Sequence, residues 1–189
     1  MSTKYDIIKF MKKFLLLFFS IVAAIYSLFY ANLGEFKGNA GALSKIGLEH
    51  PILFSLWGGL TCIALFSNVI IGFEKTKYKF HYYLITAAAV GMLLTISFDF
   101  DYSDILNYRL HCIGSLTFSI VMGLTVFLMF LLSKNYIFTA ISALILITDL
   151  ILLLIFKETA FIELFPILSG LIMMVTHNMK KEKKAVEIK

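Results

Sequence analysis

Charge is scarce in this chain. Only 15% of its 189 residues are Asp, Glu, Lys or Arg, whereas soluble domains carry about 25%. The few charges are grouped between long apolar runs, and hydrophobic residues make up 60% of the sequence. Segregation of this kind is typical of integral membrane proteins. The composition therefore argues against a soluble protein, and at this length we expect one membrane domain with no separate soluble module.

Cysteine and arginine are nearly absent as well. Cys62 lies near the middle of an apolar run, and Cys112 lies at the start of another. At about 1.5 Å per residue, their depths in a membrane differ by more than about 10 Å, which is beyond the reach of a disulfide. Both are interpreted as small buried apolar side chains. The single arginine, Arg109, excludes the row of arginines that marks a voltage sensor.

The common signatures of nucleotide binding and hydrolysis are also missing. The chain has no Walker loop, no GxGxxG after a strand, no HExxH and no GxSxG. The Gly-Ser-Leu at 114–116 is not the GxSG of rhomboid proteases, and no Cys/His spacing predicts zinc. The sequence thus names no reaction and firmly implies no cofactor.

Six apolar runs are present, and each is long enough to cross a hydrocarbon core of about 30 Å. Backbone amides cannot stay unpaired in lipid, so each run is expected to be an α-helix. The alternation typical of a membrane β-barrel is absent. The sequence therefore predicts an all-α bundle of six transmembrane helices, followed by a basic tail at 178–189. The expected spans are 14–31, 51–73, 81–98, 111–132, 136–156 and 160–177.

Lysines divide the predicted loops into two sides. Of the 17 Lys and Arg residues, only Lys37, Lys45, Arg109 and Lys157 lie on the side opposite the tails. Cytoplasmic loops carry such an excess of positive charge, so both termini are predicted to be cytoplasmic in a multi-pass protein of the plasma membrane. Attraction to anionic membrane lipid explains the net charge of +5 and is no evidence for nucleic-acid binding. The 13 lysines on the side of the two tails are Lys4, Lys9, Lys12, Lys13, Lys75, Lys77, Lys79, Lys134, Lys180, Lys181, Lys183, Lys184 and Lys189.

Acidic residues show the reverse arrangement. This topology places seven of them on the outer side, where the connections are also longer and more polar. A binding site, if the protein has one, is therefore expected to open outward. The seven are Glu35, Glu49, Asp99, Asp101, Asp104, Glu158 and Glu163.

A polar stripe descends from the outer surface along the fourth run. His111 begins this run, and Ser115 and Ser119 follow at intervals of four residues, which places all three on nearly one helix face. One interpretation is a general base or metal ligand with hydroxyl groups below it. The alternative is a histidine that anchors the helix at the membrane surface, with serines bonded to carbonyls one turn earlier.

Acidic residues and the single arginine precede this helix. Asp99 and Asp101, together with His111, would form a carboxylate–histidine cation site, or they are simply solvated. Asp104 is also expected to cap the turn that leads into the helix. Arg109 suits a phosphate or carboxylate ligand, and an ion pair with a nearby aspartate is its simpler use.

His50 is expected at the same membrane level as His111, beside Glu49. Two histidines and several carboxylates at one membrane level suggest a binding or metal site more strongly than either histidine alone. The candidate metal ligands are accordingly His50, Asp99, Asp101 and His111. Whether they converge is not decided by the sequence.

Asp149 is the only charged residue well inside a predicted span. It lies about 12 Å below the outer end of the fifth helix at 1.5 Å per residue, where an unpaired charge costs a few kcal/mol. It is read either as functional or as one side of a specific hydrogen bond between helices. Thr148 and the serine stripe are its expected partners.

Three other ionisable residues are given structural interpretations. Glu163, near the outer end of the sixth run, is an acid of the kind common at helix starts. His81 and His177 sit among lysines and are expected at the cytoplasmic membrane surface.

Small residues at intervals of four predict close helix packing. Such pairs are Ser55 with Gly59 and Gly58 with Cys62 in the second run, and Ala87 with Gly91 in the third. These faces pack inside the chain or between copies of it in an oligomer.

Two segments carry a resemblance to a family. LSKIGLEHPILFSLWGGL resembles the "Ser–x–x–Gly … Pro–x–x–Phe" approach to the second span of bacterial and archaeal six-span proteins catalogued as domain of unknown function nine-nine-eight. FDFDYSDILNYRLHCIGSLTFS resembles that family's "Phe–x–Asp … Leu–His–x–x–Gly/Ala" approach to its fourth span, although Asp99 stands where Pro is usual. The family is similar in layout to the Frag/DRAM/Sfk membrane proteins, some of which act in lipid processing or organisation. The resemblance implies functional positions at Ser44, Gly47, Pro51, Phe54, Asp101 and His111.

The leading hypothesis is a protein that binds, transports or organises a lipid or other amphiphile in an outward-facing polar pocket. Its expected ligand-binding residues are His50, Asp101, Arg109, His111, Ser115, Ser119 and Asp149. One alternative is a membrane-embedded lipid hydrolase or transferase that uses His111, Asp101 or Asp149 as an acid, a base or a metal ligand. Another is an ion- or proton-coupled transporter that uses Asp149.

Overall fold

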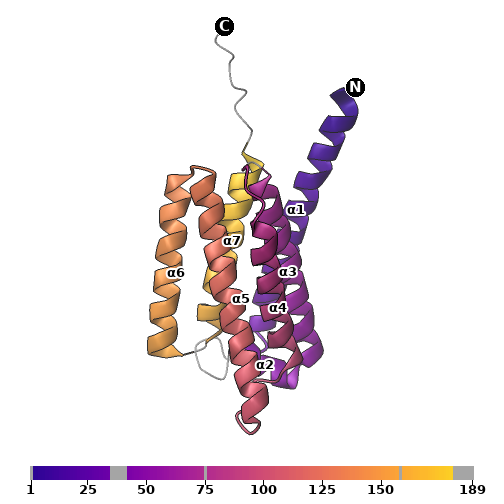
Figure 1. Ribbon diagram of the computed structural model, residues 1–189. Helices are drawn as coiled ribbons and strands as arrows, with labels where there is room; N and C mark the ends of the chain where they lie inside the picture. The colour runs from indigo at the N-terminus through magenta and orange to yellow at the C-terminus, as the bar shows by residue number, and fades with distance from the viewer. Residues whose placement is uncertain (1, 35–41, 75, 158, 181–189) are drawn as a thin grey trace.

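The computed structural model describes residues 2–34, 42–74, 76–157 and 159–180, and within these ranges every regular element is a helix. The described residues form seven successive helices, whose arrangement Figure 1 shows. The all-α prediction is therefore confirmed for the described residues. The helices are α1 (Ser2–Ala31), α2 (Leu43–Glu49), α3 (Pro51–Phe73), α4 (His81–Ser97), α5 (Ile105–Leu132), α6 (Tyr136–Phe156) and α7 (Ala160–Met179).

Five of these helices are long and apolar enough to cross a membrane, namely α1, α3, α5, α6 and α7. The run predicted at 81–98 forms α4, which has 17 residues and lies at the lower limit of about 17 residues for a span. The structure thus supports a membrane-spanning protein with five long candidate spans. Apolar side chains such as Ile25, Ile52, Leu93 and Leu154 are exposed on the helices, as expected of surfaces that face lipid.

Two helix starts differ from the predicted spans. α1 begins at Ser2, well before the apolar run at 14–31. α5 begins at Ile105, because the Asp104 carboxylate accepts hydrogen bonds from the N–H groups of Leu106 and Asn107 and so caps the helix. His111 therefore lies in the second turn of α5, rather than at its first residue.

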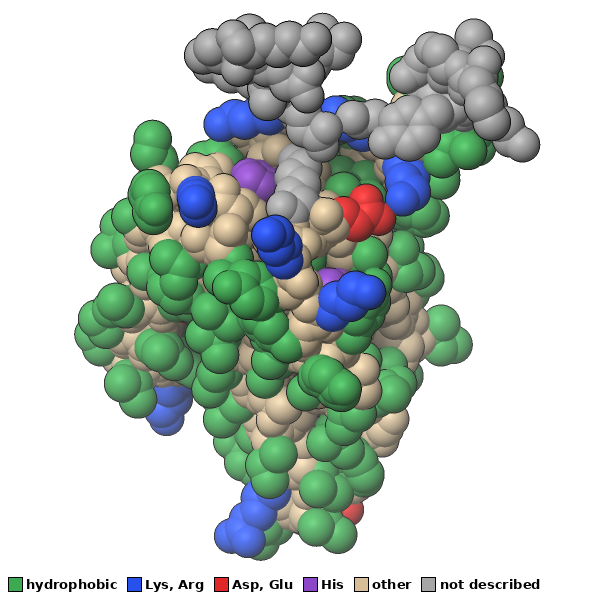
Figure 2. Space-filling model, turned by 45° about the horizontal axis from the view of Figure 1, so that its top comes forward, with side chains coloured by type: hydrophobic (Ala, Val, Ile, Leu, Met, Phe, Trp, Pro, Cys, Tyr) green, Lys and Arg blue, Asp and Glu red, His purple; other side chains and the backbone are tan. Residues whose placement is uncertain are grey.

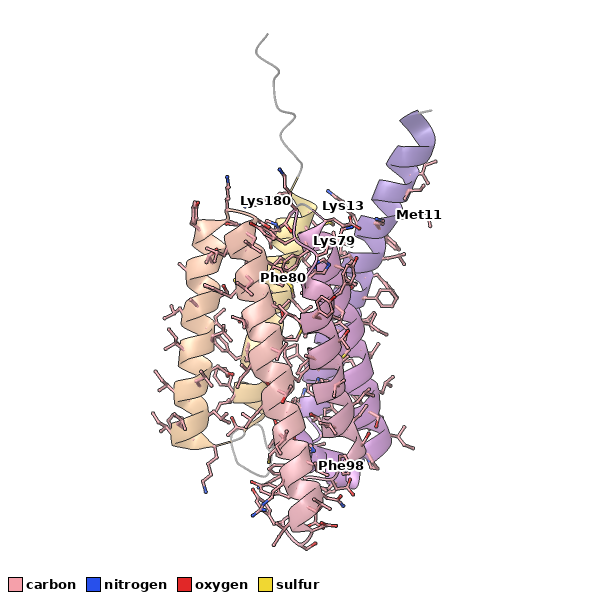
Figure 3. All side chains as sticks on the ribbon, viewed as in Figure 1. Met11, Lys13, Lys79, Phe80, Phe98 and Lys180 are labelled. Atoms are coloured by element: carbon pink, nitrogen blue, oxygen red, sulfur yellow. The ribbon has the colours of Figure 1, made fainter. Side chains whose placement is uncertain are left out.

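The two ends of the bundle differ in charge. Lys13, Lys79 and Lys180 lie at one end, and Phe98 lies at the other (Figure 3). Lysine side chains are gathered at the first end, while apolar side chains cover the flanks (Figure 2). We call the first end the lysine end. The opposite end, which contains α2 and the start of α5 (Figure 1), is called the α2 end.

Glycines bring α4 and α5 into backbone contact. A Cβ atom added to Gly91 would lie 2.7 Å from Phe118 N, and one added to Gly114 would lie 2.7 Å from Gly91 O and Thr95 N. The small-residue face predicted around Gly91 therefore packs inside the chain. Gly58 also faces α4, against Met92 and Ile96, whereas a Cβ on Gly59 would meet no atom within 4 Å.

Buried polar groups join three helices near the lysine end. Asn68 Nδ2 donates to Ser20 Oγ at 2.9 Å, and Asn178 Nδ2 donates to Asn68 O at 2.9 Å. These bonds connect α1, α3 and α7. Hydrogen bonds of this kind between helices help to fix membrane bundles. His81 and His177 are also buried here. His81 stacks on Phe73 at 4.5 Å, and His177 Nδ1 lies 3.2 Å from Asn135 Nδ2. Both histidines thus lie at the lysine end, where the sequence places them, but their rings are packed inside the bundle rather than exposed on its surface.

α6 is the least packed of the long helices. Its only buried residues among those described are Thr139 and Ser142, both in the half near the lysine end. It stands at the edge of the bundle beside α5 and α7 (Figure 1). The half of α6 near the α2 end is therefore separated from the core. The site described next lies beside that half.

Candidate functional site

His111 is the centre of a buried hydrogen-bonded group at the α2 end. Its side chain is only 1% exposed. Its Nδ1 atom lies 2.8 Å from the carbonyl oxygen of Phe98, and its Nε2 atom lies 2.9 Å from Ser44 Oγ. Three separate elements therefore hold the imidazole: α5 itself, the segment after α4, and α2.

Glu163 extends this group from the first turn of α7. Its Oε1 atom lies 3.3 Å from Ser44 Oγ, and its Oε2 atom accepts a hydrogen bond from Leu43 N at 2.5 Å. The interpretation of Glu163 as an ordinary acid at a helix start missed these contacts. We call Ser44, His111 and Glu163 the polar triad.

The hydrogen bonds determine how the polar triad shares its protons. A carbonyl only accepts, so His111 Nδ1 carries a proton and donates to Phe98. Ser44 has one hydroxyl proton and cannot donate to His111 and Glu163 together. The contacts of Ser44 with His111 and with Glu163 are both hydrogen bonds only when one further proton resides on His111 Nε2 or on Glu163. With that proton the polar triad has no net charge.

Aromatic rings hold the polar triad in place. Phe54 stacks on the His111 ring at a centroid distance of 6.0 Å, and Phe100 meets it edge-on at 5.2 Å. Tyr30 fixes α2 from the side of α1 by donating from its hydroxyl to Leu43 O at 3.0 Å. Packing and hydrogen bonds inside the bundle therefore hold the side chains of the polar triad, which do not lie in a solvent-exposed loop.

A cavity of about 510 Å³ opens beside the polar triad, and residues of α2, α3, α4, α5, α6 and α7 line it. Its walls are mostly apolar and include Leu65, Val126, Leu146 and Met173. The structure brings four of the predicted site residues to this one space, namely His111, Ser115, Ser119 and Asp149. Ser44 and Glu163 line it as well. The polar stripe of α5 thus faces α6 across a cavity.

Asp149 enters this cavity from α6. Its Oδ1 atom is buried and has no hydrogen-bond partner among the described residues. Neither Thr148 nor the α5 serines bind this oxygen, although the sequence suggested them. Pro166 of α7 also lines the cavity, and it has no N–H to donate to the Ile162 carbonyl one turn earlier. One polar atom without a partner among the described residues, Asp149 Oδ1, therefore belongs to the lining of this space.

Other predicted site residues lie away from the cavity. His50 joins α2 to α3, and its backbone N–H donates to Ile46 O. Asp101 accepts from the hydroxyl and the N–H of Ser103, which lower the pKa of its carboxyl. Arg109 is exposed. His50, Asp101 and Arg109 are not among the residues that line the large cavity, so their placement does not support their assignment as ligand-binding residues.

The proposed metal ligands do not form a metal site. Among the described residues, no group of three or more His, Cys, Asp or Glu side chains is placed to hold a metal ion. Asp99 and His111 line a second, small pocket of about 20 Å³, but His50 and Asp101 do not. Cys62 and Cys112 are both thiols. The metal interpretation of these residues thus lacks the required geometry.

The residues that carry the family resemblance meet at this small pocket. Ser44, Gly47, Pro51, Phe54 and His111 all line it. A Cβ atom on Gly47 would lie 2.9 Å from Phe54 Cγ, so glycine lets the Phe54 ring lie against α2. Asp101, the sixth position, is not part of the pocket lining.

Comparison with protein-family models, with curated proteins and with solved structures found no match to this chain. The functional argument therefore rests on the geometry of the polar triad and of the cavity.

Proposed function

We propose that this is a multi-pass plasma-membrane protein that binds a lipid or small amphiphile in the 510 Å³ cavity. The lysine end is cytoplasmic, and α4 provides a sixth span. The cavity then opens on the outer half of the membrane, with the polar triad at its outer end. This polarity suits a ligand with a polar head and an apolar tail.

The cavity is the observation that carries this proposal. Its volume lies within the roughly 300–1,000 Å³ of small-molecule sites, which combine mainly apolar walls with a few convergent polar groups. A tightly packed bundle contains few voids larger than a water molecule. A space of this size, lined by the serines of α5 and the carboxyl groups of α6 and α7, is therefore best explained by a ligand.

A cavity-filling substitution tests the proposal. Ser119→Phe places a large ring in the cavity from the exposed side chain of Ser119 on α5. We expect at least a tenfold loss of affinity for a fluorescent single-chain amphiphile, with an unchanged or higher melting temperature. Thr86→Phe is the matched control, because Thr86 is exposed on α4 and does not line the cavity. Equal binding by the Ser119→Phe variant and the unsubstituted protein would refute the proposal.

A second candidate function is acyl transfer, and it is favoured by the contact between Ser44 and His111. A serine hydroxyl within hydrogen-bond distance of an imidazole nitrogen is the arrangement of a nucleophile and its base. Ser44 Oγ would attack the carbonyl carbon of an ester, and its proton would pass to His111 Nε2. The leaving alkoxide would take that proton, and water would then release the acyl group from Ser44.

A covalent probe separates the two candidates. A lipid-like fluorophosphonate is expected to label Ser44 if acyl transfer occurs, and Ser44→Ala is expected to abolish the labelling. Ser55→Ala is the control, because Ser55 is exposed and donates to Pro51 O. Saturable amphiphile binding without any labelling would leave binding as the function and reject the catalytic one.

A further inference from the structure

Among the described residues, every Asp, Glu, Lys or Arg that lines the cavity is acidic. Asp149 projects from α6 and Glu163 from α7, and the described lining residues include no Lys or Arg. An anionic head group would therefore meet carboxyl groups and, among the described residues, no lysine or arginine. Two like charges 4 Å apart repel by about 4 kcal/mol at an effective dielectric constant of about 20. The charge of the lining thus disfavours phosphate or carboxylate head groups that lack a cation.

The two carboxyl groups differ in what they bind. Glu163 is held by Leu43 N and Ser44 Oγ and belongs to the polar triad. Asp149 Oδ1 is buried and has no partner in the described part of the chain. An ionised carboxylate in a membrane span costs a few kcal/mol unless it is paired. A bound cation would supply the partner that the protein itself does not provide.

Aromatic side chains complete the chemistry of the lining. Trp57, Phe100 and Phe118 all contribute to the cavity walls. Aromatic faces attract ammonium and quaternary ammonium groups, by about 2 kcal/mol or more where water is excluded. Carboxylates and aromatic rings in one apolar space are therefore complementary to an ammonium group on a hydrocarbon chain.

We infer that the ligand of this cavity is a cationic amphiphile whose ammonium head pairs with Asp149 and whose tail lies along Val126, Leu146 and Met173. This inference rests on the proposed function and adds the chemical class of the ligand. Asp149 is seven residues from the last residue of α6, Phe156, which corresponds to a depth of about 10 Å at 1.5 Å per residue.

Three probes with the same twelve-carbon chain test this inference. They are dodecyltrimethylammonium, an uncharged dodecyl polyoxyethylene ether and dodecyl sulfate. Each is added below its critical micelle concentration to the full-length chain in neutral maltoside micelles, and binding is measured by equilibrium dialysis against empty micelles. We expect the cationic probe to bind at least tenfold more tightly than the uncharged probe, and dodecyl sulfate to bind most weakly.

Substitutions assign the preference to one carboxylate. Asp149→Asn is expected to remove the tenfold preference, which corresponds to about 1.4 kcal/mol, and to leave binding of the uncharged probe unchanged. Asp149→Ser is a second variant that removes the charge with a smaller side chain. Glu49→Gln is the matched control, because Glu49 is exposed at the end of α2 and lines neither pocket. It is expected to keep the full preference.

The outcomes separate this inference from the proposed function. If the uncharged and cationic probes bind equally and Asp149→Asn changes neither, the charge inference is wrong and the amphiphile-binding cavity stands. If Glu49→Gln lowers cation binding as much as Asp149→Asn does, the effect belongs to surface charge and the inference is wrong. If no probe binds saturably and Ser119→Phe has no effect, the proposed function is refuted as well.

Discussion

Ser44 and His111 are 67 positions apart in the sequence, and Ser44 Oγ lies 2.9 Å from His111 Nε2. This contact fastens α2 to α5. Ser44 also lies 3.3 Å from Glu163 of α7, so one hydroxyl connects three helices. A small helix between the first two long helices thereby closes the α2 end of the bundle beside the cavity.

Removal of the Ser44 hydroxyl is expected to destabilise the bundle. In Ser44→Ala, the buried His111 and Glu163 side chains lose a shared partner, and an unsatisfied buried polar group costs about 1–3 kcal/mol. We expect the free energy of unfolding to fall by about that amount in denaturant titrations of the micelle-bound protein. Ser55→Ala removes only a bond from an exposed serine to Pro51 O and is expected to change the free energy by less than about 0.5 kcal/mol. Equal effects of the two substitutions would contradict the assigned role of Ser44.

Substitution of Glu163 tests the proton count of the polar triad. The amide of Glu163→Gln can donate to Ser44 Oγ through its NH₂ group and accept from Leu43 N through its oxygen. Ser44 is then free to donate to neutral His111, so the hydrogen bonds between Leu43 N, residue 163, Ser44 and His111 are kept. We expect Glu163→Gln to unfold within about 0.5 kcal/mol of the unsubstituted protein and Glu163→Ala to lose about 1–3 kcal/mol. A Gln variant as unstable as the Ala variant would show that the group requires a carboxylate.

The contact between α4 and α5 requires glycine. In Gly114→Ala, the added methyl group would lie 2.7 Å from the backbone atoms Gly91 O and Thr95 N, and neither atom can move without the helix. We expect a loss of about 1–3 kcal/mol, as for other overpacked cores, measured by thermal unfolding. Gly170→Ala is the control, because its Cβ would meet nothing within 4 Å and alanine favours helix by up to about 1 kcal/mol.

The long helices could be predicted because composition alone reports burial in lipid. The runs at 51–73 and 136–156 coincide with α3 and α6, since each ends at polar or turn-forming residues. The stripe of His111, Ser115 and Ser119 could also be predicted, because the helical repeat fixes which residues share a face. Depth and periodicity are local properties, and a sequence contains both.

The partners across the site could not be predicted in the same way. The sequence points to His50 because it is expected at the membrane level of His111, and to Asp101 and Arg109 because they closely precede His111 in the chain. Depth does not determine the direction in which a side chain points around the bundle, and that direction depends on packing between distant helices. Glu163 was undervalued for the same reason, since its contact with Ser44 spans 119 positions. Only the arrangement of α2 against α7 brings them together.

The asparagine pair near the lysine end is expected to stabilise the bundle modestly. Asn178 Nδ2 lies 2.9 Å from Asn68 O and 3.2 Å from Asn68 Oδ1. Hydrogen bonds between membrane helices contribute about 0.6 kcal/mol on average, and at most about 1.7. Alanine at position 68 keeps the backbone carbonyl, so a double-mutant cycle with Asn68→Ala and Asn178→Ala isolates the 3.2 Å contact between the two side chains, and its coupling free energy is expected in that range. A coupling of zero would show that Asn68 is fixed by Ser20 and its own helix alone.

Cysteine labelling tests whether α4 crosses the membrane and which end faces outward. Lys77 precedes α4 and Ser103 follows it, and both side chains are exposed. In a Cys62→Ala, Cys112→Ala background, Ser103→Cys is expected to react with a membrane-impermeant maleimide in intact cells. Lys77→Cys is expected to react only after the cells are opened, because we propose from the lysine excess that this end is cytoplasmic. Labelling of both from one side would show that α4 does not cross, and the reversed pattern would show the opposite orientation.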